Sequence, residues 1–192
     1  MTEIKREGTT LPIDCLPWRE EYPYAPKTSV TLGYDEEGLT LHFTTDETNL
    51  RATETEHNTF VYKDSCMEAF IQFDPAHDSH YINIEINPNG AAFAACGTCR
   101  EDYGMVAVED IETLGVRTAV HEDGWEIFYR IPVAFVKKYI PSYRHGEGAR
   151  LRANFYKCGD ETDHPHFASF APIGVAEPDF HRPEYFAELV LS

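Results

Sequence analysis

The stretch SVTLGYDEEGLTLHFTT, residues 29–45, decides the fold class of this chain. Apolar and polar residues alternate before and after the acidic turn DEEG. Alternation with a period of two predicts β-strands with one buried face. The turn, which ends in a glycine, joins the two strands into a hairpin. The buried face is formed by Val30, Leu32, Tyr34, Leu39, Leu41 and Phe43.

Further short strands follow along the chain, separated by turn residues. They are predicted at residues 66–73, 81–87, 91–95, 115–121, 125–131, 149–158 and 185–191. One short helix is predicted in IPVAFVKKYIP, residues 131–141, where Pro132 stands near the start and Pro141 at the end. Many short strands with almost no helix predict an all-β fold, an antiparallel β-sandwich of the jelly-roll or immunoglobulin-like type.

The chain of 192 residues has the length of one domain. Residues 1–28 contain four prolines and no clear alternation, so we expect an irregular segment that packs on the body. Residues 29–192 are expected to form a single β-sandwich domain. An apolar content of 42% argues for a folded globular protein and against disorder.

The net charge of −17 narrows the class of partner. A surface this acidic repels phosphate backbones and anionic lipids, so neither nucleic acid nor a membrane is an expected partner. Hard cations such as calcium remain compatible. No hydrophobic leader stands at the start, and five cysteines are an odd number, so we expect reduced thiols and a cytoplasmic location. A secreted location is the alternative if a leader has been removed from the given chain.

Three predicted strands carry planar hydrogen-bonding groups on the face opposite their apolar residues. Carboxylates, amides, guanidinium groups and phenols discriminate among hydroxyl groups. If these strands are neighbours, the face is a ligand platform; otherwise it is a solvated or loop-covered face. The groups are Glu68 and Gln72, Asn83 and Glu85, and Arg152, Asn154 and Tyr156.

The stretch YKCGDETDHPHFASF, residues 156–170, leaves two other chemistries open. His164 and His166 are two residues apart and, with Asp160, resemble three zinc ligands. Cys158 is a nucleophile only if a histidine lies beside it in space. A structural turn and a buried thiol are the simpler interpretations.

A carboxylate pair is a further alternative, because Glu68 and Glu85 on adjacent strands resemble the acid and base of a glycoside hydrolase. Such pairs arise by chance in any β-sheet. The motif CGTC contains one cysteine pair, whereas structural zinc sites usually need two pairs.

Four motifs in order resemble the family 9-like carbohydrate-binding modules. They cover residues 51–73, 81–87, 152–173 and 179–191, so the resemblance extends over nearly the whole chain from about residue 29. It implies a β-sandwich that binds a mono- or oligosaccharide without catalysis and holds the terminal sugar between aromatic rings. It also implies structural calcium, for which the acidic turns offer Asp74 and Asp78.

The resemblance assigns individual residues by position. Glu68 and Asp64 match the acids of the founding DSVE motif, and Phe170 stands where the family usually carries tryptophan. A second aromatic falls near Tyr62, although this motif has one extra residue. Combined with the polar strand faces, the predicted ligand-binding residues are Tyr62, Glu68, Asn83, Glu85, Arg152, Asn154, Tyr156 and Phe170.

Two other functions remain open from the sequence. One is an enzyme that acts on a sugar through a carboxylate pair. The other is a metal- or haem-binding sandwich of the related cytochrome-type domains, in which histidine and methionine ligands are expected on strands. Met67 is expected to face the core.

Overall fold

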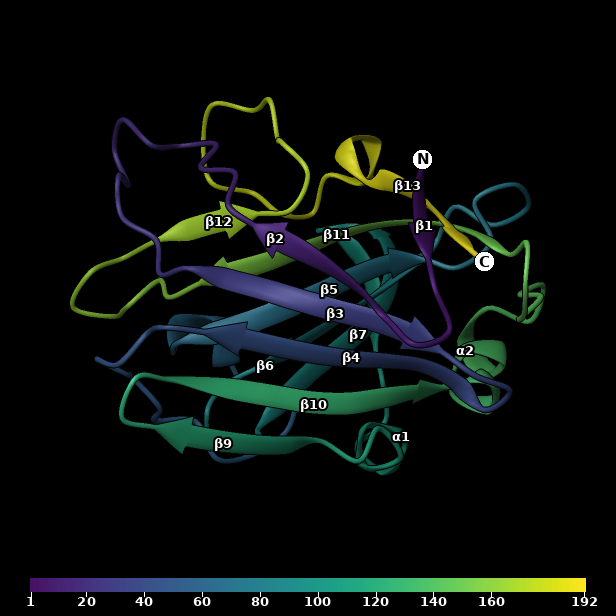
Figure 1. Ribbon diagram of the computed structural model, residues 1–192, viewed down its shortest axis with the longest axis horizontal. Helices are drawn as coiled ribbons and strands as arrows, with labels where there is room; N and C mark the ends of the chain where they lie inside the picture. Colours follow the sequence, from purple (N-terminus) through teal and green to yellow (C-terminus); the bar gives the residue numbers. More distant parts are fainter.

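The computed structural model describes residues 1–192, which form two β-sheets packed face to face (Figure 1). One sheet contains, in spatial order, β2 (Thr9–Ile13), β3 (Thr28–Tyr34), β4 (Gly38–Thr45), β10 (Gly124–Pro132) and β9 (Arg117–His121). The other contains β1 (Thr2–Ile4), β13 (Ala187–Leu191), β11 (Arg150–Cys158), β5 (Cys66–Gln72), β6 (Tyr81–Ile86), β7 (Ala92–Cys99) and β8 (Asp102–Met105), and β12 (Phe167–Ser169) pairs with β11. All neighbouring strands are antiparallel except β1 and β13. The predicted β-sandwich is confirmed.

The hairpin predicted from residues 29–45 consists of β3 and β4. In its turn, Asp35 Oδ1 accepts hydrogen bonds from the backbone N–H groups of Glu37 at 2.9 Å and Gly38 at 3.3 Å. Gly38 has φ +156°, and an added Cβ would lie 2.1 Å from the carbonyl oxygen of Ile131. Glycine is therefore required here because β10 approaches so closely.

Residues 1–28 contribute a strand to each sheet, which corrects the expectation of an irregular segment. β1 pairs with β13, and β2 pairs with β3 at the edge of its sheet. Pro12 lies within β2. An edge strand tolerates proline because the missing N–H faces away from the ladder. The proline content of this segment therefore hid the strand.

The predicted helix is α2 (Val133–Tyr139), and a second helix, α1 (Val108–Glu112), was not predicted. α1 has five residues, too few for a helical period to be recognised. Two 3₁₀ turns, η1 (Val61–Lys63) and η2 (Pro183–Tyr185), complete the elements. None of the helices is long and apolar enough to cross a membrane.

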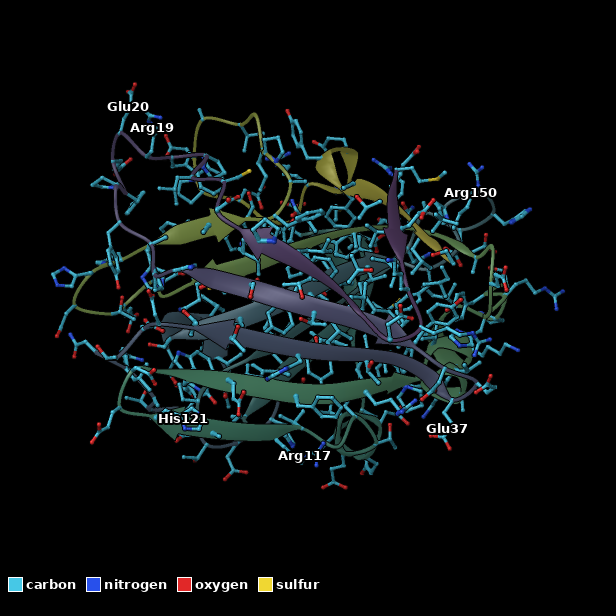
Figure 2. All side chains as sticks on the ribbon, viewed as in Figure 1. Arg19, Glu20, Glu37, Arg117, His121 and Arg150 are labelled. Atoms are coloured by element: carbon cyan, nitrogen blue, oxygen red, sulfur yellow. The ribbon has the colours of Figure 1, made fainter.

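The main core lies between the two sheets. Ile82, Ile84 and Ile86 of β6 and Met67 of β5 belong to it, as the alternation predicted. Most charged side chains lie at the periphery, although those of Glu47, Asp64, Glu68, Glu85 and Lys157 are buried. Those labelled in Figure 2, such as Glu37 and Arg150, are exposed.

The opposite face of the β5–β6 region is covered by a second apolar cluster. Trp18 comes from the segment that follows β2, and Phe180 and Phe186 come from the loop between β12 and β13. Every residue of β5 and β6 is consequently buried. This face is loop-covered rather than an open platform.

Candidate functional site

Two buried carboxyl groups, those of Glu68 and Glu85, lie directly opposite each other on the neighbouring strands β5 and β6. Asn83, two residues before Glu85, donates a hydrogen bond from Nδ2 to Glu85 Oε1 at 2.9 Å. The sequence predicted these polar groups without establishing that the strands are neighbours. The pairing brings the three side chains to one place.

A cavity of about 260 Å³ opens over this group. Its walls come from the η1 region, from β7 and β8, from the start of the loop after β11, and from the loop at residues 178–181. The side chains that line it include Phe60, Tyr62, Glu68, Asn83, Glu85, Phe93, Arg100, Tyr103, Cys158, Asp160, Asp179, Phe180 and His181. Four of the predicted ligand-binding residues, Tyr62, Glu68, Asn83 and Glu85, are among those that line it.

Burial shifts the protonation of the acids in the cavity. It raises the pKa of Glu68 well above its usual range, and the neighbouring Glu85 carboxylate raises it further. It raises the pKa of Glu85 to about 7 and that of Asp160 to about 6. The Glu68–Glu85 pair therefore retains at least one proton near neutral pH, and it offers both a donor and acceptors.

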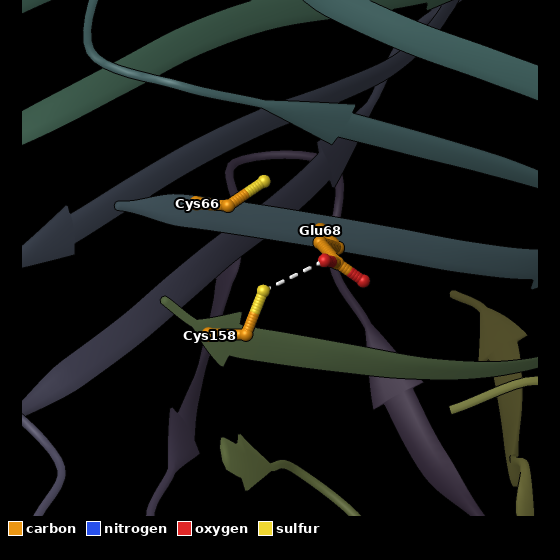
Figure 3. A group of neighbouring side chains, drawn as sticks. All are labelled: Cys66, Glu68 and Cys158. Atoms are coloured by element: carbon orange, nitrogen blue, oxygen red, sulfur yellow. Dashed lines mark hydrogen bonds between the residues drawn. The ribbon is translucent and has the colours of Figure 1, made fainter. Parts of the chain in front are cut away.

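The thiol of Cys158 donates a hydrogen bond to Glu68 Oε1 at 2.9 Å (Figure 3). Cys66 lies opposite Cys158 in the β5–β11 ladder. Burial raises the pKa of Cys66 to about 12 and that of Cys158 well above its usual value. Both sulfur atoms are thus protonated thiols at neutral pH, which argues against the nucleophile interpretation of Cys158.

An arginine–aspartate pair forms part of the wall. Arg100 donates hydrogen bonds to Asp179 Oδ1 from Nη2 at 2.8 Å and from Nε at 3.2 Å. His181, beside this pair, is hydrogen-bonded through Nδ1 to the hydroxyl of Tyr81 at 2.7 Å. Burial and the positive charge of Arg100 lower the pKa of His181 to about 4, so its ring is neutral at pH 7.

Aromatic rings surround the opening of the cavity. Phe60 is 62% exposed, Tyr103 52% and Tyr62 36%, and all three line the cavity. Large exposed aromatic side chains that meet at a concave site mark a binding surface. Phe93 and Phe180 lie deeper and extend the apolar wall.

The other four predicted ligand-binding residues do not line the cavity. Arg152 donates to the backbone carbonyl of Phe186 at 3.1 Å, and the Asn154 amide pairs with the backbone of Ala171. Both side chains therefore hold loops onto the sheet.

Two predicted aromatic contacts are likewise placed elsewhere. Tyr156 is completely buried, and its hydroxyl donates to the carbonyl oxygen of Phe180 at 3.1 Å. Phe170 packs on the main core beside Phe155, with ring centroids 6.0 Å apart. Alternation placed Tyr156 on the correct face of the sheet, but the loop that covers this face separates it from the cavity.

The zinc set His164, His166 and Asp160 is not assembled. His166 is buried and accepts a hydrogen bond from Lys157 Nζ at 2.9 Å, whereas His164 is exposed. Asp160 lies on the cavity wall. The three side chains lie in different surroundings and do not form a common zinc site.

Only one group of three potential metal-ligand side chains is present, formed by Cys66, Glu68 and Cys158. Two sulfur atoms do not suit a hard cation such as calcium. Asp74 and Asp78, the acids considered for calcium, are each hydrogen-bonded to a histidine side chain. Neither residue belongs to a group of three potential ligand side chains, and calcium stays a prediction from the family resemblance.

Several cavity residues were not predicted from the sequence, because they lie in loops or outside the polar strand faces. Phe60, Arg100, Asp179 and His181 come from three turns or loops whose path no periodicity describes. Tyr103 lies on the short edge strand β8, whose four residues are all exposed. The sequence feature that could have identified them is the density of aromatic and charged residues in 59–62, 100–103 and 179–181.

A sequence profile described as carbohydrate-binding family 9 matches residues 4–191. No curated protein matches the chain. A proposed carbohydrate-binding protein from Bacteroides uniformis ATCC 8492 has a similar structure, with a TM-score of 0.84 and 28% identity over 97% of this chain and 87% of that one. A carbohydrate-binding module of family 9 from Caldicellulosiruptor kristjanssonii, solved with cellotriose and with glucose, gives a TM-score of 0.63 at 13% identity. The match covers 99% of this chain and 92% and 94% of the chains in the two complexes.

Proposed function

Because this chain belongs to carbohydrate-binding family 9, we propose that it binds a sugar, without catalysis, in the cavity over Glu68 and Glu85. The observation that carries this proposal is the combination of buried carboxyl and amide groups inside the cavity with exposed aromatic rings around its opening. A sugar presents hydroxyl groups and apolar C–H faces together, so it requires both kinds of partner. The Caldicellulosiruptor module, which has the same fold, was solved with cellotriose and with glucose.

The polar groups match hydroxyl recognition. Glu68, Asn83 and Glu85 supply carboxyl and amide oxygens as acceptors, and a protonated carboxyl group supplies a donor. All three are held by the sheet, so little side-chain entropy is lost on binding. The aromatic rings of Phe60, Tyr62 and Tyr103 then cover the apolar face of the ring.

The size of the cavity favours one sugar ring. Its volume of about 260 Å³ lies just below the range of about 300–1,000 Å³ found for pockets that hold drug-sized ligands. An oligosaccharide would therefore insert one unit and leave the rest outside. The proposed ligand is a monosaccharide or the end of a longer chain.

A sugar-acting enzyme is the second candidate, and the facing carboxyl groups of Glu68 and Glu85 favour it. The raised pKa of each group suits a general acid. Turnover of a panel of aryl glycosides separates the two functions. A binding protein gives affinity without release of the aryl group.

The experiment that tests sugar binding starts with an array of mono- and oligosaccharides and continues with calorimetry on the best ligand. Tyr62→Ala removes a ring at the opening of the cavity and should weaken binding about three- to tenfold, which corresponds to the loss of about 0.5–1.5 kcal/mol. Val120→Ala is the matched control, since Val120 is 59% exposed on β9 of the other sheet. Equal affinity of the two variants would show that the sugar binds elsewhere.

A structural calcium ion stays a prediction taken from the family resemblance. Metal analysis of the purified protein tests it directly. Stoichiometric calcium would support the prediction, and purified protein without calcium would contradict it.

A further inference from the structure

Two cysteines and a glutamate meet beside the cavity. Cys66 and Cys158 are direct partners in the antiparallel ladder between β5 and β11, and Glu68 follows two residues after Cys66 on the same face of β5 (Figure 3). The two Sγ atoms and a carboxylate oxygen of Glu68 all lie within 4.8 Å of one another. The register of two paired strands therefore fixes the spacing of these three side chains.

This spacing is close to that of a metal site. Metal–ligand bonds of about 2.0–2.3 Å in a tetrahedral zinc site place the ligand atoms about 3.3–3.8 Å apart. The three ligand atoms of Cys66, Glu68 and Cys158 therefore need to move by about 1 Å or less, which small rotations of the side chains provide.

The hydrogen bonds that the two thiols make are weak. The Cys158 thiol donates to Glu68 Oε1 at 2.9 Å, and its next acceptor, the carbonyl oxygen of Tyr62, lies at 3.7 Å. Cys66 Sγ lies 4.0 Å from the carbonyl oxygen of Met67. A thiol is a weak donor, so little hydrogen bonding is lost when a metal ion takes the place of these two protons.

The cavity gives an ion access to the group. Glu68 and Cys158 line the cavity, whereas Cys66 is completely buried behind them. Three protein atoms would hold the ion on the side of the sheet, and a water molecule from the cavity would complete the tetrahedron. Zinc sites with three protein ligands and one open position have this arrangement.

We propose that Cys66, Cys158 and Glu68 bind a divalent cation of the zinc class, with its fourth coordination position facing the cavity. The donor set selects this class, because thiolate sulfur prefers Zn²⁺ and softer ions whereas Ca²⁺ and Mg²⁺ take oxygen ligands. Only the thiolates ligate a metal, so binding releases the two thiol protons to the solvent. The site goes beyond the proposed sugar binding and does not depend on it.

Titration of the full chain with Cd²⁺ tests the proposal. The protein is first freed of metal with a chelator and kept reduced with a phosphine, so that all five cysteines stay thiols. Cd²⁺ held by thiolates should give a new ultraviolet charge-transfer band that saturates at one ion per chain. Zn²⁺ should remove this band by competition, and equilibrium dialysis should likewise find one tightly bound Zn²⁺ per chain.

Variants locate the ion. Cys66→Ser and Cys158→Ser each remove one sulfur ligand and should weaken Zn²⁺ binding at least about a hundredfold, because the loss of an outer-shell partner alone costs about 10–100-fold. Glu68→Gln keeps both sulfur atoms, so it should retain the Cd²⁺ band but weaken binding. It is the second test if a serine variant fails to fold.

The double variant Cys96→Ser/Cys99→Ser is the matched control. It also removes sulfur, from two cysteines of β7 that do not line the cavity, and should leave both the band and the affinity unchanged. If this variant lost the band while Cys66→Ser and Cys158→Ser kept it, the ion would lie at the CGTC motif and the proposal would be wrong.

Two further results would also overturn the proposal. One is the lack of a Cd²⁺ band in the reduced wild type. The other is Zn²⁺ binding that is equally strong in the wild type and in every variant, which would place the ion on surface histidines. Neither result bears on sugar binding, because the sugar array and the Tyr62→Ala comparison use metal-free protein. Failure to find a sugar ligand would leave the metal site standing.

Discussion

Tyr156 and Phe180 stack face to face, with ring centroids 4.0 Å apart and planes inclined by 4°. Phe180 lines the cavity, and Tyr156 lies behind it in β11. The Tyr156 hydroxyl also donates to the carbonyl oxygen of Phe180 at 3.1 Å. A residue on the strand thus holds a loop residue in the wall of the site.

Tyr156→Phe should lower the free energy of unfolding by about 1–3 kcal/mol, because the carbonyl of Phe180 is left without its buried donor. Sugar affinity should change less than about twofold, since the ring stack remains. Chemical denaturation and calorimetry measure the two effects. Tyr24→Phe, at a residue that is 44% exposed, is the control and should change neither. A large loss of affinity at unchanged stability would mean that Tyr156 contacts the sugar itself.

Glu68→Gln should have a small effect on the affinity for a neutral sugar, below about threefold. Burial keeps Glu68 largely neutral, and glutamine is also neutral with one acceptor and donors. Glu68→Ala removes these groups and should weaken binding more than tenfold, about 1.4 kcal/mol. Calorimetry on both variants makes the comparison. A ten- to hundredfold loss in Glu68→Gln would show instead that the bound sugar requires the ionised carboxylate.

Glu85 should make the protein less stable at alkaline pH. The pKa of Glu85 is raised from 4.5 in the unfolded chain to about 7 in the folded protein. The contribution of its neutral carboxyl group to the free energy of unfolding is therefore complete below pH 4.5, and it is lost as the pH rises through 7. The free energy of unfolding of the wild type, relative to that of Glu85→Gln, should fall by about 2–3 kcal/mol between pH 5 and pH 8, because each unit of pKa shift corresponds to about 1.36 kcal/mol. Urea denaturation across this range measures the difference. A difference that does not vary with pH would mean that Glu85 ionises normally.

Lys157→Met should destabilise the fold by about 3–5 kcal/mol, because Glu47 would keep a buried charge without its partner. The double variant Lys157→Met/Glu47→Gln should recover at least about 2 kcal/mol. Glutamine removes this charge and keeps an acceptor for the Nε1–H of Trp125, which now lies 3.0 Å from Glu47 Oε2. Denaturation of the two variants is the measurement. If Lys157→Met were as stable as the wild type, the ion pair between Lys157 and Glu47 would make no measurable contribution to stability.

The alternation of apolar residues predicted the β-sandwich and its longer strands, whereas the short strands β1, β2, β8 and β12 were missed. The site was only half predictable. Glu68, Asn83 and Glu85 lie on two adjacent strands, so their face followed from a period of two. Arg152 and Asn154 share that property, yet loops cover them. Which part of a polar face stays open depends on the path of loops, and a local pattern does not encode that path.

The parallel pairing of β1 with β13 determines how the protein would respond to mechanical force. Thr2 lies beside Leu189, and Ile4 beside Leu191. A pull on the two ends of the chain would draw these strands past each other along their length (Figure 1). All the hydrogen bonds between them would then be loaded at once rather than one after another. Under tension, the few residues that close this edge of the sheet would act as a shear clamp for the whole domain.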